Sequence, residues 1–201
     1  MEMIQYKRHF LMLGLATIVL SLSYLGPDLV PAGDARFFSL FGLVGALHAT
    51  SLVTSLRQGS AVKLKIAFVA LAAVLSAVTI LLAMVAIPIL SMIPGDSARF
   101  FLFLLLASAL GASGYWLLVR WFWLKALRFD GLIITVGVCT VATLVSWGAS
   151  MLLALLPWAW HEGLMRTTPQ VITNILPTTA WWAGFSGSLY WIERRLITDS
   201  R

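Results

Sequence analysis

The sequence predicts an all-α membrane protein in which residues 1–201 form one transmembrane domain of six helices. Three observations predict this class. The chain is 60% hydrophobic and only 11% charged, whereas a soluble domain is about half apolar and about a quarter charged. Six long apolar runs follow one another along the chain. A short sequence motif that contains an Arg also recurs at the start of two of these runs.

The six apolar runs define the predicted helices. Because a helix rises about 1.5 Å per residue, about 20 apolar residues are needed to cross the hydrocarbon core. Five runs meet this length easily and the first is slightly short. The predicted helices cover residues 9–26, 36–56, 65–91, 99–119, 131–157 and 171–192.

The first helix follows Lys7 and Arg8, as the apolar core of a signal sequence does. Pro27 and Asp28 come after it, at the place where a small-residue cleavage site is expected. We therefore predict an uncleaved transmembrane helix.

The basic residues predict the orientation. Eleven fall on one side of the predicted helices and three on the other, which is a strong positive-inside bias. We expect both termini in the cytoplasm, three hairpins that open outward, and a location in a plasma membrane, as in the bacterial inner membrane. The net charge of +6 then reflects orientation and contact with anionic lipid headgroups rather than nucleic acid. The inner set is Lys7, Arg8, Arg57, Lys63, Lys65, Arg120, Lys125, Arg128, Arg194, Arg195 and Arg201.

An internal repeat organises the middle of the chain. Residues 31–94 align with 94–157 at an offset of 63, and Ala-Arg-Phe-Phe recurs intact at 35–38 and 98–101. Self-similarity at a fixed period predicts one helical hairpin used repeatedly, here as three parallel repeats of which the third is faint. Asp34 and Ser97 are the predicted N-caps of the second and fourth helices, because a side-chain oxygen can accept from the free N–H groups of a first turn.

The outer face carries three basic residues, one for each hairpin: Arg36, Arg99 and Arg166. The planar fork of Arg matches phosphate and carboxylate, so these residues are candidates for binding an anionic group. The alternative is that each side chain reaches to lipid phosphate.

His48 lies near the middle of the second helix, where an ionisable group is a candidate functional residue. The alternative is a neutral imidazole bonded to a nearby hydroxyl. His9 and His161 are expected at opposite membrane faces, so we predict no second mid-membrane His, no metal site and no cofactor.

Small residues mark two kinds of packing face. The fifth helix places hydroxyl and thiol side chains at spacings of three and four, on one face. The second, fourth and sixth helices each carry a G-x-x-G pair, where another helix can approach closely. Packing is the favoured role and the wall of a solute path is the alternative. The residues are Thr135, Cys139, Thr143, Ser146, Ser150, Gly42, Gly45, Gly111, Gly114, Gly184 and Gly187.

The sixth helix is the most irregular and polar of the six. Pro177 removes a backbone hydrogen bond and predicts a kink. Four residues near its start are candidates for a specific contact or binding site: Asn174, Thr178, Trp181 and Trp182.

The functional expectation is a non-enzymatic protein. No intramembrane carboxylate pair, phosphate loop or converging Ser-His-Asp set is evident in the sequence. The favoured hypothesis is an accessory or scaffold subunit that docks onto other membrane proteins or onto itself. The alternative is a small-solute permease or substrate-binding component, with a cavity between the second, fifth and sixth helices.

Overall fold

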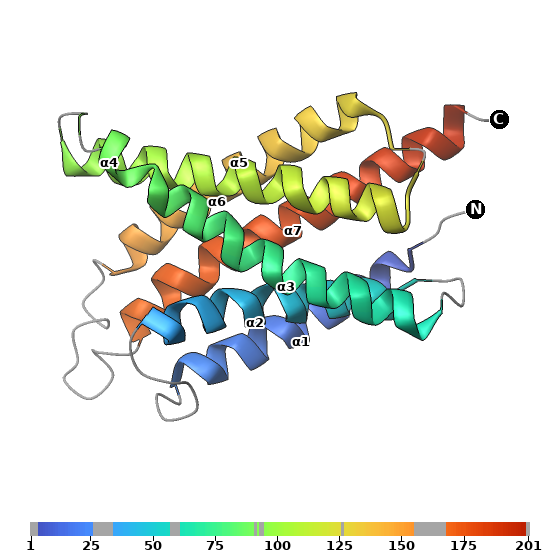
Figure 1. Cartoon of the computed structure of the whole chain (residues 1–201), viewed down its shortest axis with the longest axis horizontal. Coiled ribbons are helices and arrows are strands. Elements are labelled where there is room, and N and C mark those ends of the chain that lie inside the picture. The colour runs from blue at the N-terminus through green and yellow to red at the C-terminus, as the bar shows by residue number, and fades with distance from the viewer. Residues whose placement is uncertain are drawn as a thin grey trace.

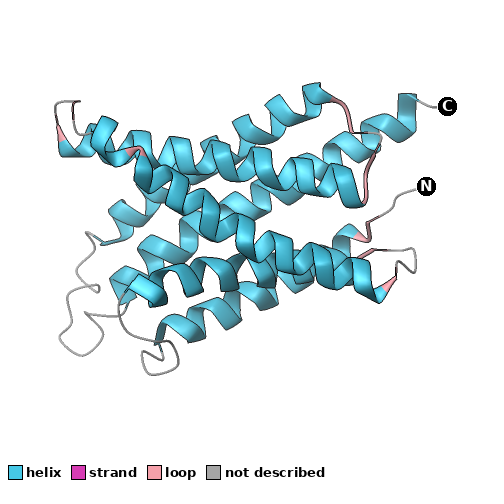
Figure 2. Cartoon of the chain, in the orientation of Figure 1, coloured by secondary structure: helices cyan, strands magenta, loops and turns pink. Residues whose placement is uncertain are grey.

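The chain is helical throughout the part that its computed structural model describes, apart from short connections (Figure 2). That part comprises residues 4–25, 34–56, 61–90, 92, 95–125, 127–154 and 168–199. It contains six long helices and one short one, in agreement with the predicted all-α class. Their bounds are α1 Tyr6–Leu25, α2 Asp34–Thr54, α3 Val62–Val85, α4 Ile87–Leu90, α5 Asp96–Phe122, α6 Phe129–Ala154 and α7 Thr168–Asp199.

Three helices of the described part are long and apolar enough to cross a membrane. They are Val62–Val85 in α3, Phe101–Phe122 in α5 and Phe129–Leu152 in α6. No more than a third of the residues in each of these spans is buried within the bundle, as is typical of helices that also face lipid. The finding supports a membrane protein, while the internal repeat and the side of the membrane on which the termini lie stay predictions.

The six long helices pack side by side as a closed ring. The main contacts run from α1 to α2, from α2 to α3, from α3 to α5, from α5 to α6, from α6 to α7, and from α7 back to α1. Figure 1 shows that α1 begins and α7 ends at the same end of the bundle. The side chains that point into the ring therefore come from helices far apart in the sequence.

Two predicted boundaries are corrected. The predicted helix 65–91 is interrupted, because α3 ends at Val85 and α4 starts at Ile87 after a turn at Ala86. Pro88 explains the break, since it lacks an N–H and its ring clashes with the carbonyl of residue 84.

The start of α5 also differs from the prediction. Ser97 lies within the helix, and the N-cap is Gly95, which makes no side-chain cap bond. Gly95 has φ +94, a left-handed conformation that glycine adopts without strain.

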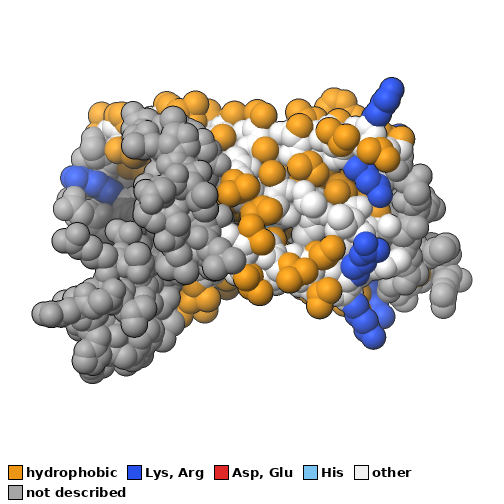
Figure 3. All heavy atoms as spheres, turned by 90° about the horizontal axis from the view of Figure 1, so that it is seen from below, with side chains coloured by type: hydrophobic (Ala, Val, Ile, Leu, Met, Phe, Trp, Pro, Cys, Tyr) orange, Lys and Arg blue, Asp and Glu red, His pale blue; other side chains and the backbone are white. Residues whose placement is uncertain are grey.

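The described basic side chains gather at one end of the ring (Figure 3). They lie in the first turns of α1 and α3, in the last turns of α5 and α7, and between α5 and α6; Arg99 lies at the opposite end. Trp121 is 79% exposed at the basic end, as an aromatic belt requires. Trp123, two residues later, is instead buried against Phe68 and Phe122.

Candidate functional site

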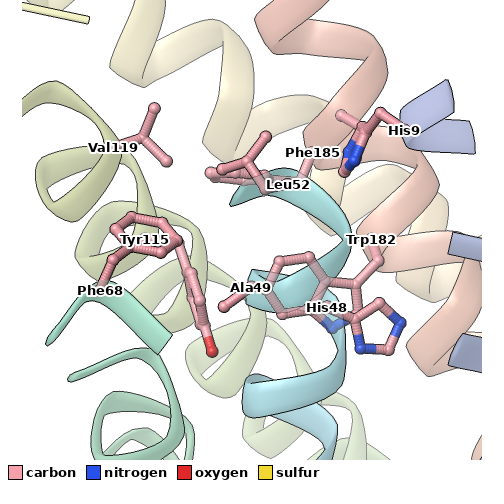
Figure 4. Close-up of a pocket in the computed structure, with 10 residues that line it drawn as sticks. His9, His48, Ala49, Leu52, Phe68, Tyr115, Val119, Trp182 and Phe185 are labelled. Atoms are coloured by element: carbon pink, nitrogen blue, oxygen red, sulfur yellow. The ribbon is translucent and has the colours of Figure 1, made fainter. Parts of the chain in front are cut away.

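The interior of the ring is aromatic, and His48 lies within it. The His48 imidazole stacks on the Trp182 indole, with centroids 4.5 Å apart and planes at 5°. Tyr115 meets the same indole edge to face at 4.6 Å. The contacts join α2, α5 and α7, so tertiary packing makes one cluster of three separate helices (Figure 4).

The two ring nitrogens of His48 have different environments. Nδ1 donates to the carbonyl oxygen of Val44 at 2.7 Å, one turn earlier in α2. Nε2 is buried and has no hydrogen-bond partner among the described residues. An unpartnered polar atom in an apolar interior is costly, which makes Nε2 of His48 the most unusual polar atom of the cluster.

His9 lies in the same region, contrary to the prediction that it sits at a membrane face. It is 3% exposed, and its Nε2 lies 2.7 Å from the Ser186 hydroxyl. Ser51 donates to the His48 carbonyl at 2.7 Å, and its oxygen lies 3.4 Å from His9 Nδ1. Nδ1 of His9 therefore donates to Ser51, and Nε2 accepts from Ser186. Nothing in the sequence indicated this burial, because His9 directly follows Lys7 and Arg8, which are both exposed.

Tyr115 anchors the cluster on its other side. Its hydroxyl donates to the Ala72 carbonyl at 2.7 Å and lies 2.6 Å from the Ser76 hydroxyl, both on α3. Gly45 of α2 lies directly against these groups. A Cβ there would come 2.6 Å from the Ala72 oxygen and 2.6 Å from the Tyr115 hydroxyl, and would also clash with the Ser76 oxygen. The junction of α2, α3 and α5 thus requires glycine at position 45.

A small cavity adjoins the cluster (Figure 4). It leaves about 10 Å³ for the centre of a water molecule, which is room for about one water. Residues of α1, α2, α3, α5 and α7 line it, whereas the hypothesis of a solute path placed a cavity between the helices now labelled α2, α6 and α7. Its lining residues are His9, His48, Ala49, Leu52, Phe68, Tyr115, Val119, Trp182, Phe185 and Ser186.

The polar face of α6 turns toward its neighbours. The five hydroxyl and thiol side chains predicted to share this face are buried: Thr135, Cys139, Thr143, Ser146 and Ser150. Each hydroxyl bonds a carbonyl one turn earlier, and Thr143 also meets Ser108 of α5 at 3.4 Å. Ser188 of α7 meets Thr135 at 3.1 Å.

The G-x-x-G pairs differ in how closely they are approached. A Cβ on Gly111 would lie 3.2 Å from Trp181, and one on Gly114 would lie 2.8 Å from Leu75, so either methyl group would require that side chain to shift. A Cβ on Gly184 would lie 3.2 Å from Ala142 of α6. Gly187 has nothing within 4 Å, and Gly42 has only an ordinary contact.

Most of the predicted outer site lies outside the described residues. This holds for Arg166 and for the side chains of Arg36 and Asn174. Arg99 and Thr178 are described and half-buried. Of the four candidates on the sixth helix, Trp181 and Trp182 join the central aromatic cluster.

Sequence reasoning missed one buried pair. Tyr6 donates to Glu193 at 2.7 Å, between α1 and α7, and Glu193 is 5% exposed. A signal was present: Thr179, Trp182, Ser186 and Glu193 share one face of α7 at spacings of three, four and seven residues.

No family model, no curated protein and no solved structure matches this chain. In the described part, no group of three or more His, Cys, Asp or Glu side chains is arranged to hold a metal ion. The site must therefore be interpreted from its own chemistry.

Proposed function

We propose that this chain is an accessory subunit of the membrane, a helical body that packs against a larger membrane protein and catalyses no reaction itself. The observation that carries the proposal is the filled interior of the ring. Among the described residues, the cavity beside His48 has room for about one water, which is too little for a larger solute. Its large exposed surface is apolar and suited to lipid or to another transmembrane helix.

The orientation and repeat belong to the same proposal. The basic end faces the cytoplasm of a bacterial cell, with both termini on that side, because the described cations concentrate there. The hairpins α2–α3 and α5–α6 are copies of one unit, offset by 63 residues.

Site-specific photocrosslinking in the native membrane tests the accessory role. A photoreactive residue is placed at one lipid-facing position on each of four helices: Ile18, Val74, Leu117 or Val141, all about half exposed or more. One polypeptide of defined mass should crosslink at one or two adjacent helices. The buried position Phe185, tested in the same way, should give no intermolecular product. Absence of a position-dependent product, or equal labelling of many proteins at all positions, would contradict the accessory role.

A second candidate is a small-solute permease or membrane substrate-binding component. The observation that favours it is the pair of buried histidines, because ionisable side chains inside a helical bundle often mark a solute or proton path. The central cavity would have to widen for a solute larger than water to pass.

Swelling of reconstituted vesicles in isosmotic urea or glycerol separates the two functions. A permease accelerates swelling over protein-free vesicles, and His48→Leu, which removes both ring nitrogens, alters that rate. An accessory subunit leaves the rate equal to that of protein-free vesicles for the wild type and the variant alike.

A further inference from the structure

An open apolar groove of about 370 Å³ runs between α6 and α7. The groove begins where α6 and α7 approach each other closely, at Gly184. A Cβ on Gly184 would lie 3.2 Å from Ala142 of α6, whereas at Gly187, three residues further on, nothing lies within 4 Å. The buried sides of the two helices stay in contact nearer the basic end, where Ser188 meets Thr135 at 3.1 Å. The groove is therefore an opening on the outer side of their interface, walled by Ile134, Val138 and Trp191.

The groove has no polar group that needs a partner. Ser188 is the polar side chain in its lining, and its hydroxyl is already bonded to the Phe185 carbonyl at 2.8 Å and to Thr135 at 3.1 Å. In a bilayer, an unfilled apolar groove forfeits dispersion contacts along its walls. A flexible hydrocarbon chain from the surrounding lipid fills such a space without leaving any hydrogen bond unmade.

The mouth of the groove is cationic. Trp191, 48% exposed, is the lining residue of α7 nearest the basic end, and the Arg195 guanidinium lies 5.3 Å from the Trp191 ring centroid. Asp130, one turn before Ile134 on α6, accepts from the Gly131 N–H and lies 3.9 Å from Arg128. The negative charge of Asp130 is therefore already balanced by Arg128.

Two further charged side chains of α7 are consistent with a cationic mouth. Arg194 lies over Tyr190, adding a second cation to the last turns of the helix. Glu193 is turned away toward Tyr6 of α1. Arg binds phosphate through a planar fork, and basic pockets between transmembrane helices bind lipid headgroups.

We propose that the groove between α6 and α7 is a specific site for one anionic glycerophospholipid. One acyl chain lies along Gly187 between Ile134 and Val138, and the headgroup phosphate is held at Arg195 beside Trp191. The site is independent of the proposed accessory role, which concerns protein partners.

Native mass spectrometry of the full chain in mild detergent tests the site. The probes are dioleoylphosphatidylglycerol, which is anionic, and dioleoylphosphatidylcholine, which is zwitterionic. The wild type should retain one phosphatidylglycerol in preference to phosphatidylcholine. Arg195→Gln should lower that preference about fivefold, the effect of one cation near a lipid surface. Lys63→Gln, at the start of α3, is the control for loss of a charge elsewhere at the same end and should leave the preference unchanged.

A matched pair of leucine variants tests the groove itself. Gly187→Leu fills it and should abolish retention of the single lipid, whereas Gly14→Leu places the same side chain on α1, where nothing lies within 4 Å either. Both changes favour a helix, so a folding defect is not expected. Equal binding to both lipids, or retention of the lipid by Gly187→Leu, would overturn the proposal. A dimer or a bound protein that Gly187→Leu dissociates would also overturn it, by showing that a helix occupies the groove.

Discussion

The two glycines of the first G-x-x-G pair should respond in opposite ways to alanine. At Gly45 the added methyl group meets the Ala72 carbonyl and the Tyr115 hydroxyl at 2.6 Å, and it also meets Ser76. At Gly42 the nearest atom, the Ala73 carbonyl oxygen, is 3.8 Å away, which is an ordinary contact. Gly45→Ala and Gly42→Ala therefore make the same chemical change in the same helix, three residues apart, but only Gly45→Ala creates a clash.

The expected difference can be worked out from these contacts. Overpacking costs about 1–3 kcal/mol, and displacing the Tyr115 hydroxyl adds about 0.6 kcal/mol, the average for a hydrogen bond between membrane helices. Alanine improves helix propensity by about 1 kcal/mol at either position, so this term cancels between the two variants. Gly45→Ala should be less stable than Gly42→Ala by about 2–4 kcal/mol, and Gly42→Ala should be as stable as the wild type or more so.

The assay is reversible unfolding in mixed micelles of a mild detergent and dodecyl sulfate, followed by tryptophan fluorescence. Trp182 reports on the affected junction because it contacts Tyr115 directly. Equal stability of the two variants would refute the packing of α2 against α3 and α5, and with it the closed ring at this point.

Three other predictions concern separate parts of the bundle. Tyr6→Phe should destabilise the chain by about 1–3 kcal/mol, because the buried Glu193 carboxylate loses a hydrogen-bond donor. Unfolding in the same micelles measures this loss. A Tyr6→Phe variant as stable as the wild type would show that this hydrogen bond does not stabilise the fold. Cys139 is fully buried and should react with a maleimide only after denaturation, so rapid labelling of the folded chain would contradict the packing of α6 on α7. Arg36→Ala with Arg99→Ala should leave the orientation in the membrane intact, because the cations of the other end set it; a topology reporter that inverts would show that reasoning to be wrong.

The sequence predicted where the helices lie along the chain better than it predicted which side chains of different helices meet. Every predicted apolar run falls largely within a helix, because the length and hydropathy of a run are local properties. The break at Ala86 was missed, although Pro88 is a local signal, because the apolar run continues through it. The cap at Gly95 was missed because the hydroxyl of Ser97 favoured a side-chain cap two residues later. The residues that form the polar face of α6 and the glycine faces could also be predicted, since helical periodicity fixes which residues share a face.

By itself, the sequence determined that this is a helical chain with an apolar perimeter and a cationic end, because composition and period act within one segment at a time. Only the tertiary structure decided that His9 shares the ring interior with His48, that Tyr6 meets Glu193, and that an apolar groove opens between α6 and α7. Each of these depends on how helices that are distant in the sequence turn toward one another. That rotation is set by side-chain packing across the interfaces, which no single helix encodes.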